Sequence, residues 1–166
     1  MLITGVYGAG KSTVAADIAD VLERRRVPYG AIDLDWIMWF DTGRDDMDEL
    51  GRKVFLANLA DVVRNYLEVG VERIVLAGAI ESRVDLDGVR GAVPLPLTVV
   101  RLTVPLREVV RRLRSDPTAG RQDDLQVAID WTDAAVGLGL DDFSMANEGA
   151  VRDTSTAILE RLGWLE

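Results

Sequence analysis

The sequence predicts a three-layer α/β domain in which helices cover both faces of a five-stranded parallel sheet. Two observations carry this prediction. Short apolar runs alternate with helical patterns along all 166 residues, and the first run leads at once into a glycine-rich turn and a helix. Such alternation is typical of parallel sheets, because each crossover helix returns the chain to the same end of the sheet. No linker or internal repeat interrupts the pattern, so we expect a single domain over residues 1–166.

The expected strands are short apolar runs bounded by turn residues or acidic residues. The third and fourth runs are almost continuously apolar, which is typical of strands that are buried on both faces. The second run alternates apolar and polar residues and ends in acid. In chain order, the five expected strands are 1–4, 29–35, 73–79, 97–104 and 141–147.

The expected helices carry apolar residues at intervals of three or four. Val14, Ile18 and Leu22 mark the first helix, which ends before Pro28 because proline interrupts a helix. The second helix ends near Gly70, since glycine often follows a helix C-terminus. The expected helices are about 12–26, 47–70, Pro105 through Leu113, 123–136 and 150–162.

Composition excludes several functional classes. The chain has no cysteine and no histidine, which excludes disulfides, thiolate metal sites and Ser-His catalysis. The net charge of −9 argues against a nucleic-acid surface. No apolar run approaches the roughly 18 residues that a membrane span needs. We therefore expect a cytoplasmic protein, monomeric or homodimeric, whose partner is a small molecule and not nucleic acid or a membrane.

The turn after the first strand matches the pattern G-x-x-x-x-G-K-[ST] through Gly5, Gly10, Lys11 and Ser12. Glycines let successive backbone N–H groups curve around a phosphate, and the helix that follows adds its positive end. In such a P-loop, the lysine reaches the β- and γ-phosphates of ATP and the hydroxyl binds Mg²⁺. The residues expected to hold the nucleotide here are Gly5, Tyr7, Gly8, Ala9, Gly10, Lys11, Ser12 and Thr13.

Lysine is otherwise scarce in this chain. Lys11 and Lys53 are the only two lysines among 19 basic residues. A chain that favours arginine has therefore kept a lysine where a compact ammonium group suits phosphate.

Asp33 and Asp35 follow the second expected strand. In a parallel sheet, ligands gather beyond the carboxyl ends of the strands, and strand alternation would place both carboxylates on one side. One could hold Mg²⁺ through water, and the other could accept the proton of an attacking hydroxyl. The alternative is a solvated strand end in which an aspartate caps a turn or helix.

Arginines dominate residues 107–121. Arg112 could contact adenine or phosphate, and Arg121 could close over the reaction from a lid at about 114–124. The alternative is a solvated basic helix face paired with Asp116 and Asp123. No acid ends the strand at 73–79 and no N-K-x-D pattern occurs, which argues against motor ATPases and GTPases.

Taken together, these motifs resemble the small P-loop kinases of the nucleoside-monophosphate-kinase-like fold, which include shikimate, gluconate, adenylylsulfate and adenylate kinases. "GVYGAGKSTVAADIAD" and "IDLD" look like the first helix and the Asp-x-Asp of shikimate kinases. The resemblance implies a P-loop NTPase fold, with Asp33 supporting Mg²⁺ through water and Asp35 binding the acceptor hydroxyl. It further implies that Arg121 is a lid arginine and that the loop from Asn147 borders adenine.

Two departures leave the acceptor open. "AGAIESR" stands where shikimate kinases carry a Gly-Gly pair, and Asp116 stands where a second lid arginine is usual. The closest resemblance is therefore to a group of small "AAA-family" or adenylylsulfate-kinase-like proteins whose substrate is not fixed.

The acceptor region is expected at about 36–69. Trp36, Trp39 and Phe40 could form the floor of a pocket, or Trp36 and Phe40 could be core residues on one helix face. Arg44 and Arg52 could pair with an acidic substrate group.

The sequence thus predicts an ATP- and Mg²⁺-dependent kinase that phosphorylates a small hydroxyl-bearing metabolite. Two alternatives stay open. One is a nucleotide-binding regulator or NTPase without an acceptor, and the other is a nucleoside or nucleotide kinase.

Overall fold

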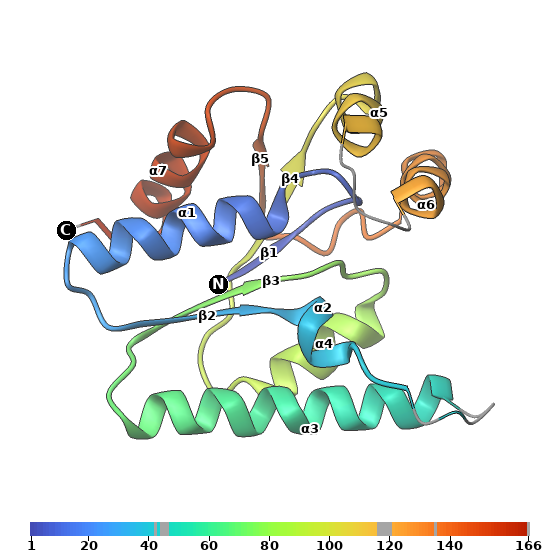
Figure 1. The fold of residues 1–166 in the computed structure, drawn as a ribbon. Coiled ribbons are helices and arrows are strands. Elements are labelled where there is room, and N and C mark those ends of the chain that lie inside the picture. The colour runs from blue at the N-terminus through green and yellow to red at the C-terminus, as the bar shows by residue number, and fades with distance from the viewer. Residues whose placement is uncertain (42, 44–46, 116–120, 135, 166) are drawn as a thin grey trace.

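The computed structural model describes residues 1–166 except 42, 44–46, 116–120, 135 and 166. It contains one five-stranded sheet in the order β2-β3-β1-β4-β5, and every strand pair is parallel (Figure 1). The fold class predicted from the sequence is therefore confirmed. The strands are β1 (Leu2–Thr4), β2 (Tyr29–Asp33), β3 (Arg73–Ala77), β4 (Val99–Thr103) and β5 (Phe143–Ala146).

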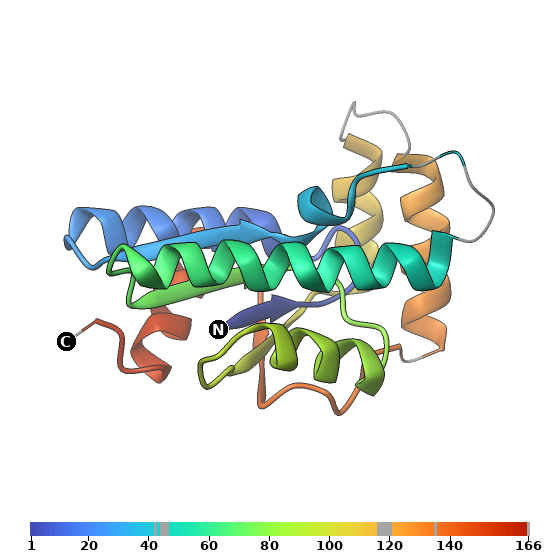
Figure 2. The same cartoon turned by 90° about the horizontal axis from the view of Figure 1, so that it is seen from below.

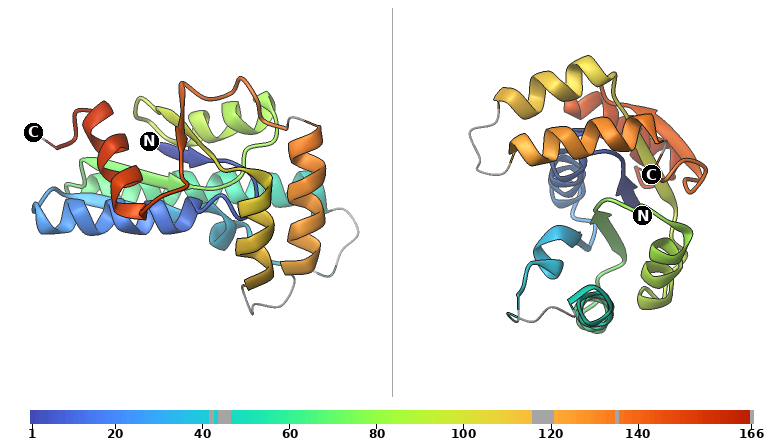
Figure 3. Two further views of the ribbon diagram at one scale, coloured as in Figure 1. Left: turned by 90° about the horizontal axis from the view of Figure 1, so that it is seen from above. Right: turned by 90° about the vertical axis from the view of Figure 1, so that its right-hand side faces the viewer.

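Helices cover both faces of the sheet. Figures 1 and 2 show α1 (Lys11–Arg24) and α7 (Val151–Arg161) on one face, with α3 (Met47–Glu68) and α4 (Arg83–Ala92) on the other. The helices α5 (Leu106–Ser115) and α6 (Arg121–Asp133) lie side by side beyond the carboxyl ends of the strands (Figure 3). The short α2 (Leu34–Met38) directly follows β2.

The alternation of side chains along each strand divides the core into two layers. Leu2 of β1 lies opposite Leu76 and Val99 of its neighbours, and all three belong to the core under α3 and α4. The adjacent Ile3 faces the core under α1 and α7. Because both faces are buried, these strands are apolar at nearly every position.

The central position of β1 determines where the functional residues meet. One neighbour, β3, leads outward to β2, and the other neighbour, β4, leads outward to β5. At such a switch point, the loops that leave adjacent strands diverge and open a crevice at the carboxyl edge. The glycine-rich turn leaves β1 at this edge.

Two helices were not predicted from the sequence. β2 ends at Asp33 because the Asp33 carboxylate caps α2, accepting a hydrogen bond from the Asp35 amide at 3.1 Å. Ser82 caps α4 in the same way and also donates to the Asp85 carboxylate at 2.5 Å. Among the described residues, no helix combines the length and apolar character needed to cross a membrane.

Candidate nucleotide and acceptor site

The P-loop adopts a backbone that requires glycine. Gly5, Gly8 and Gly10 have φ angles of 143°, 76° and 93°, all in the region that side chains disfavour. A Cβ at Gly5 would lie 2.8 Å from the Leu102 carbonyl oxygen, and one at Gly10 would lie 2.6 Å from the Asn147 amide nitrogen. Each glycine therefore allows a close approach as well as a turn.

The first turn of α1 is suited to an anion. Gly10 occupies the N-cap position and offers no side chain, and the first turn carries no acidic residue. The first intrahelical bond of this end runs from the Val14 amide to the Gly10 carbonyl. The amides of Lys11, Ser12 and Thr13 precede that bond, so they point out of the helix with its positive end behind them.

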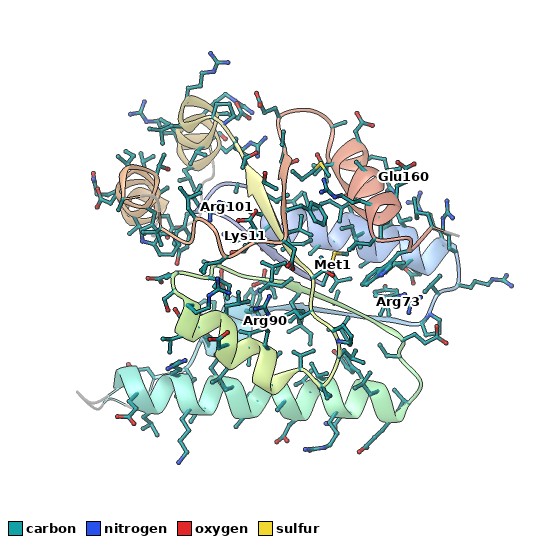
Figure 4. All side chains as sticks on the ribbon, turned by 180° about the vertical axis from the view of Figure 1, so that it is seen from behind. Met1, Lys11, Arg73, Arg90, Arg101 and Glu160 are labelled. Atoms are coloured by element: carbon teal, nitrogen blue, oxygen red, sulfur yellow. The ribbon has the colours of Figure 1, made fainter. Side chains whose placement is uncertain are left out.

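Lys11 lies at the centre of the molecule, where Figure 4 labels it. Its side chain is buried, with 8% exposed. Nζ donates to the Val6 carbonyl at 3.2 Å and lies 5.2 Å from the centre of the Tyr7 ring. A buried ammonium beside a helix N-terminus concentrates positive charge at one point, which favours the binding of polyphosphate.

These groups line a cleft of about 460 Å³. The cleft brings together nine of the residues predicted from the sequence: Tyr7, Gly8, Gly10, Lys11, Ser12, Thr13, Asp35, Arg112 and Asn147. Two apolar residues that were not predicted, Leu113 and Val151, complete the lining. Gly5 and Ala9 are also part of the loop, but both are buried and neither lines the cleft.

Arg112 and Asn147 hold the P-loop in place through the carbonyl of Ala9. Both donate to the Ala9 carbonyl, Asn147 at 2.8 Å and Arg112 at 3.3 Å, and Arg112 also donates to the Asn147 carbonyl at 2.7 Å. Asn147 is 2% exposed and also accepts from Thr154 at 3.1 Å. The solvated basic face considered for Arg112 is therefore wrong, because its guanidinium joins α5, the P-loop and the loop after β5.

Glu108 completes this set of contacts. Its carboxylate accepts from Arg112 at 2.8 Å and from Arg111 at 2.6 Å and 2.7 Å. These hydrogen bonds lower the pKa of Glu108 to about 2. Glu108 therefore stays ionised and holds Arg112 in place at any ordinary pH.

Asp35 lines the cleft from the start of α2. The prediction that strand alternation would place Asp33 and Asp35 on one side is wrong, because the chain turns into a helix after Asp33. Asp33 is half-buried and caps that helix, whereas Asp35 is exposed and lines the cleft. Burial, and then the charges of Asp35, Asp124 and Glu81, raise the pKa of Tyr7 above its usual value.

A second cavity of about 470 Å³ lies between α2, α3 and α4. Leu34 lines it, whereas the next residue, Asp35, lines the cleft beside the P-loop, which we call the phosphate cleft. The start of α2 therefore contributes to both cavities. Three charged residues, Arg52, Glu81 and Asp85, also line the cavity. The remaining lining is apolar: Leu34, Met38, Phe55, Leu56, Ala79, Ile80 and Val89.

The other predicted substrate residues lie elsewhere. Trp36 is 71% exposed and Trp39 is 76% exposed, and their ring centres are 5.2 Å apart. The interpretation of Trp36 as a core residue is therefore wrong, and neither tryptophan lines either of the two cavities. Arg44 and residues 116–120 of the expected lid lie outside the described residues. Arg121 begins α6, but its side chain also lies outside them.

Sequence reasoning missed Asp85, the ion-pair partner of Arg52, although a signal for it was present. Ser82 and Asp85 form the S-x-x-D pattern of a capping box, which marks a helix start just after β3. The contact of Tyr7 with Trp131 of α6, at 5.2 Å between ring centres, had no such local signal because the two residues are distant in sequence.

No family model matches this chain, and no curated protein matches its sequence. Its structure nevertheless matches 281 solved chains. A sugar kinase from Janibacter is 20% identical with a TM-score of 0.65, covering 99% of this chain and 94% of that one. A shikimate kinase from Bacteroides thetaiotaomicron is 18% identical with a TM-score of 0.64, covering 98% and 97%.

A third match is the APS kinase of Mycobacterium tuberculosis, solved in complex with AMPPNP and APS. It is 17% identical with a TM-score of 0.64, covering 98% of this chain and 95% of that one. This chain has the P-loop kinase fold. The similarity extends over nearly the full length of each protein, so the fold expected from the sequence motifs is confirmed.

Proposed function

We propose that this protein is an ATP- and Mg²⁺-dependent kinase that transfers a phosphoryl group to a small hydroxyl-bearing metabolite. The observation that carries the proposal is the pair of adjoining cavities. One presents loop amides, a helix N-terminus and Lys11, as phosphate binding requires, and the other adjoins it across the start of α2. The second cavity gives an acceptor a place beside the phosphates, which a protein that only binds or hydrolyses a nucleotide does not require. The solved sugar, shikimate and APS kinases of the same fold support this assignment.

The chain's own residues have distinct tasks in this reaction. The loop amides and Lys11 hold the phosphates and stabilise the charge that develops on the transferred group. Asp35 accepts a hydrogen bond from the acceptor hydroxyl and orients it toward the γ-phosphate. It takes the proton as the acceptor oxygen bonds to the γ-phosphorus, while the bond from that phosphorus to the bridging oxygen breaks and ADP leaves. Arg112 and Asn147 keep the loop fixed, and Arg121 closes over the reaction from the lid.

The residues present fit Mg²⁺ in a nucleotide complex. Mg²⁺ needs only one or two protein oxygens when phosphates and waters complete its shell. Ser12 offers an exposed hydroxyl in the cleft. Asp33 does not line the cleft, and its half-buried carboxylate, which caps α2 at the end of β2, is the group that we assign to a ligand water of the metal. Among the described residues, no three acidic side chains gather as a self-sufficient metal site, consistent with a metal that enters with ATP. Bound Mg²⁺ supplies charge neutralisation at the phosphates.

The alternative of a nucleoside or nucleotide kinase has less support. It relies on Trp36 and Trp39 stacking a base, and both rings lie outside the two cavities. The regulator alternative keeps the P-loop but gives Asp35 no task.

The experiment is an ATP-dependent phosphorylation screen of small hydroxyl compounds, with calorimetry of ATP and Mg²⁺ alongside. Lys11→Ala should weaken ATP binding about 10- to 100-fold, because it removes charge-assisted hydrogen bonds to phosphate. Lys53→Ala, the only other lysine and an exposed one, serves as the matched control and should leave ATP binding unchanged. Asp35→Asn should lower transfer about 10²- to 10⁴-fold with little change in ATP affinity.

Two results would contradict the proposal. One is the absence of transfer to any compound above the Lys11→Ala blank. The other is slow ATP hydrolysis that Asp35→Asn leaves unchanged, which would favour the regulator.

A further inference from the structure

The second cavity, between α2, α3 and α4, is called the acceptor cavity below, and it carries more acidic than basic side chains, which does not suit an acidic ligand. Its described lining contains one base, Arg52, and two acids, Glu81 and Asp85, so its formal charge is −1. Arg52 already has partners: its Nη2 donates to the Val84 carbonyl at 2.6 Å, and its Nε lies 3.8 Å from the Asp85 carboxylate. An anionic substrate would have to compete with both.

Glu81 is placed differently. It is exposed where the chain leaves β3, and it makes no hydrogen bond or ion pair with any other described residue. The preceding residue, Ile80, donates its backbone N–H to the Thr4 hydroxyl at 3.1 Å, and Thr4 ends β1 directly before the P-loop. Glu81 therefore lies on the side of the cavity that is nearest the phosphate cleft. A carboxylate at this point can pair with a ligand cation without displacing an existing contact.

The rest of the cavity favours an apolar body. Leu34, Met38 and Phe55 face it from two helices, and Ile80 and Val89 face it from the segment after β3 and from α4. Pockets of several hundred Å³ with such walls enclose molecules larger than a triose, using a few polar groups to orient them.

We propose that the acceptor is an alcohol with a compact apolar body and a protonated amine, and that Glu81 recognises the amine. This inference rests on the proposed kinase function, because it assigns the substrate class of the same site. It replaces the expectation that Arg52 pairs with an acidic substrate group, since the structure pairs Arg52 with Asp85. Glu81 repels an anion, and the apolar walls offer it no compensating donor.

The test uses three probes that share a phenyl ring and a hydroxyl and differ in charge. They are 2-amino-1-phenylethanol, 1-phenylethane-1,2-diol and mandelate, which are cationic, neutral and anionic near pH 7. Binding is followed by NMR of the ¹³C-labelled methionine methyl groups, because Met38 lines the cavity and the chain has only 4 methionines. This readout needs no turnover, so its failure is distinct from failure of the kinase proposal in the phosphorylation screen.

The cationic probe should perturb Met38 and bind about tenfold more tightly than mandelate, because a partly exposed ion pair and the matching repulsion each contribute a few-fold. Glu81→Gln should reduce this preference to about two- or threefold. The matched control Asp87→Asn removes an exposed charge of α4 that does not line the cavity, and it should leave the preference intact. In the phosphorylation screen, Glu81→Gln should raise KM for a cationic acceptor while kcat and KM for ATP stay within twofold.

Three outcomes would overturn the inference while leaving the kinase proposal standing. Mandelate could bind most tightly, no probe could perturb Met38, or Glu81→Gln could leave the cation preference unchanged. Transfer only to acidic acceptors in the screen would have the same effect.

Discussion

Replacement of Gly10 by alanine tests the structure of the P-loop directly. Gly10 has a φ of 93°, and a Cβ built on it would lie 2.6 Å from the Asn147 side-chain nitrogen. Asn147 cannot simply move away, because it is 2% exposed and its amide bonds the Ala9 carbonyl and Thr154. Gly10→Ala therefore combines a strained backbone with the displacement of a buried amide.

The expected cost is the sum of two contributions. A side chain in a left-handed conformation costs about 1–2 kcal/mol. Displacing Asn147 from its two hydrogen bonds costs about 1–3 kcal/mol, since its buried partners lose a bond without gaining water. We therefore expect the free energy of unfolding to fall by about 2–5 kcal/mol, and ATP affinity to fall at least about tenfold because the loop amides shift with the backbone.

Two other glycines provide matched controls in urea unfolding. Gly139 has a φ of 72°, and a Cβ at this position would have no atom within 4 Å, so Gly139→Ala measures the conformational cost alone, about 1–2 kcal/mol. Gly149 has the same open space without a positive φ, so Gly149→Ala should change stability by less than about 0.5 kcal/mol. Calorimetry with ATP and Mg²⁺ should show normal binding for Gly139→Ala, whereas Gly149→Ala is a control for stability alone because Gly149 belongs to the loop expected beside adenine.

A double mutant identifies the cause. In an Asn147→Ala background the clash disappears, so Gly10→Ala should then cost no more than Gly139→Ala. The reasoning is refuted if Gly10→Ala costs no more than Gly139→Ala in the wild-type background, or if Asn147→Ala leaves the cost of Gly10→Ala unchanged.

Two further predictions concern ionisation. Hydrogen bonds from two arginines lower the pKa of Glu108 from 4.5 to about 2, so its stabilising effect is complete above pH 4.5 and is lost as the pH falls through about 2. In acid unfolding curves, the difference in free energy of unfolding between wild type and Glu108→Gln should therefore be constant above about pH 5 and shrink below it. A difference that grows toward low pH would contradict this. Burial, and then the charges of Asp35 and two other acids, raise the pKa of Tyr7 above its usual value of 10, so Asp35→Asn should lower the pKa of that phenol in an ultraviolet titration. Tyr7→Phe identifies the signal of Tyr7. An unchanged titration would show that the charge of Asp35 does not act on Tyr7.

The sequence was sufficient to predict the fold and the phosphate-binding loop because both depend on local patterns. Gly5, Gly10 and Lys11 act through backbone conformation and chain order, and the strands are apolar wherever the sheet is buried on both faces. The acceptor cavity could not be predicted in the same way. It forms where α2, α3 and α4 meet, and its one basic residue, Arg52, is paired with an acid 33 positions away. Pairings of that kind depend on packing, which leaves no periodic trace in the sequence.

Asp33 shows the same limit of prediction from sequence, because an aspartate that supports a metal ion and an aspartate that caps a helix look alike in the sequence. The cap has a structural consequence. Successive residues of a helix are about 100° apart, so ending β2 at Asp33 turns Leu34 into the acceptor cavity and Asp35 into the phosphate cleft. Asp33→Ala removes the cap and should cost about 1 kcal/mol of stability and lower kcat by misplacing Asp35.

Asp33→Asn separates the two roles, because asparagine caps a helix as well as aspartate does but lacks the charge. If Asp33 serves only as a cap, Asp33→Asn keeps wild-type kcat and an unchanged Mg²⁺ requirement, and Asp33→Ala alone is impaired. If Asp33 also supports a ligand water, both variants need more Mg²⁺ for half-maximal activity, and only Asp33→Ala loses stability. We expect the second pattern, because β2 and β1 run parallel in one sheet, so Asp33 and the P-loop both lie at the carboxyl ends of their strands. An asparagine variant with the Mg²⁺ dependence of the wild type would restrict Asp33 to the architecture of α2.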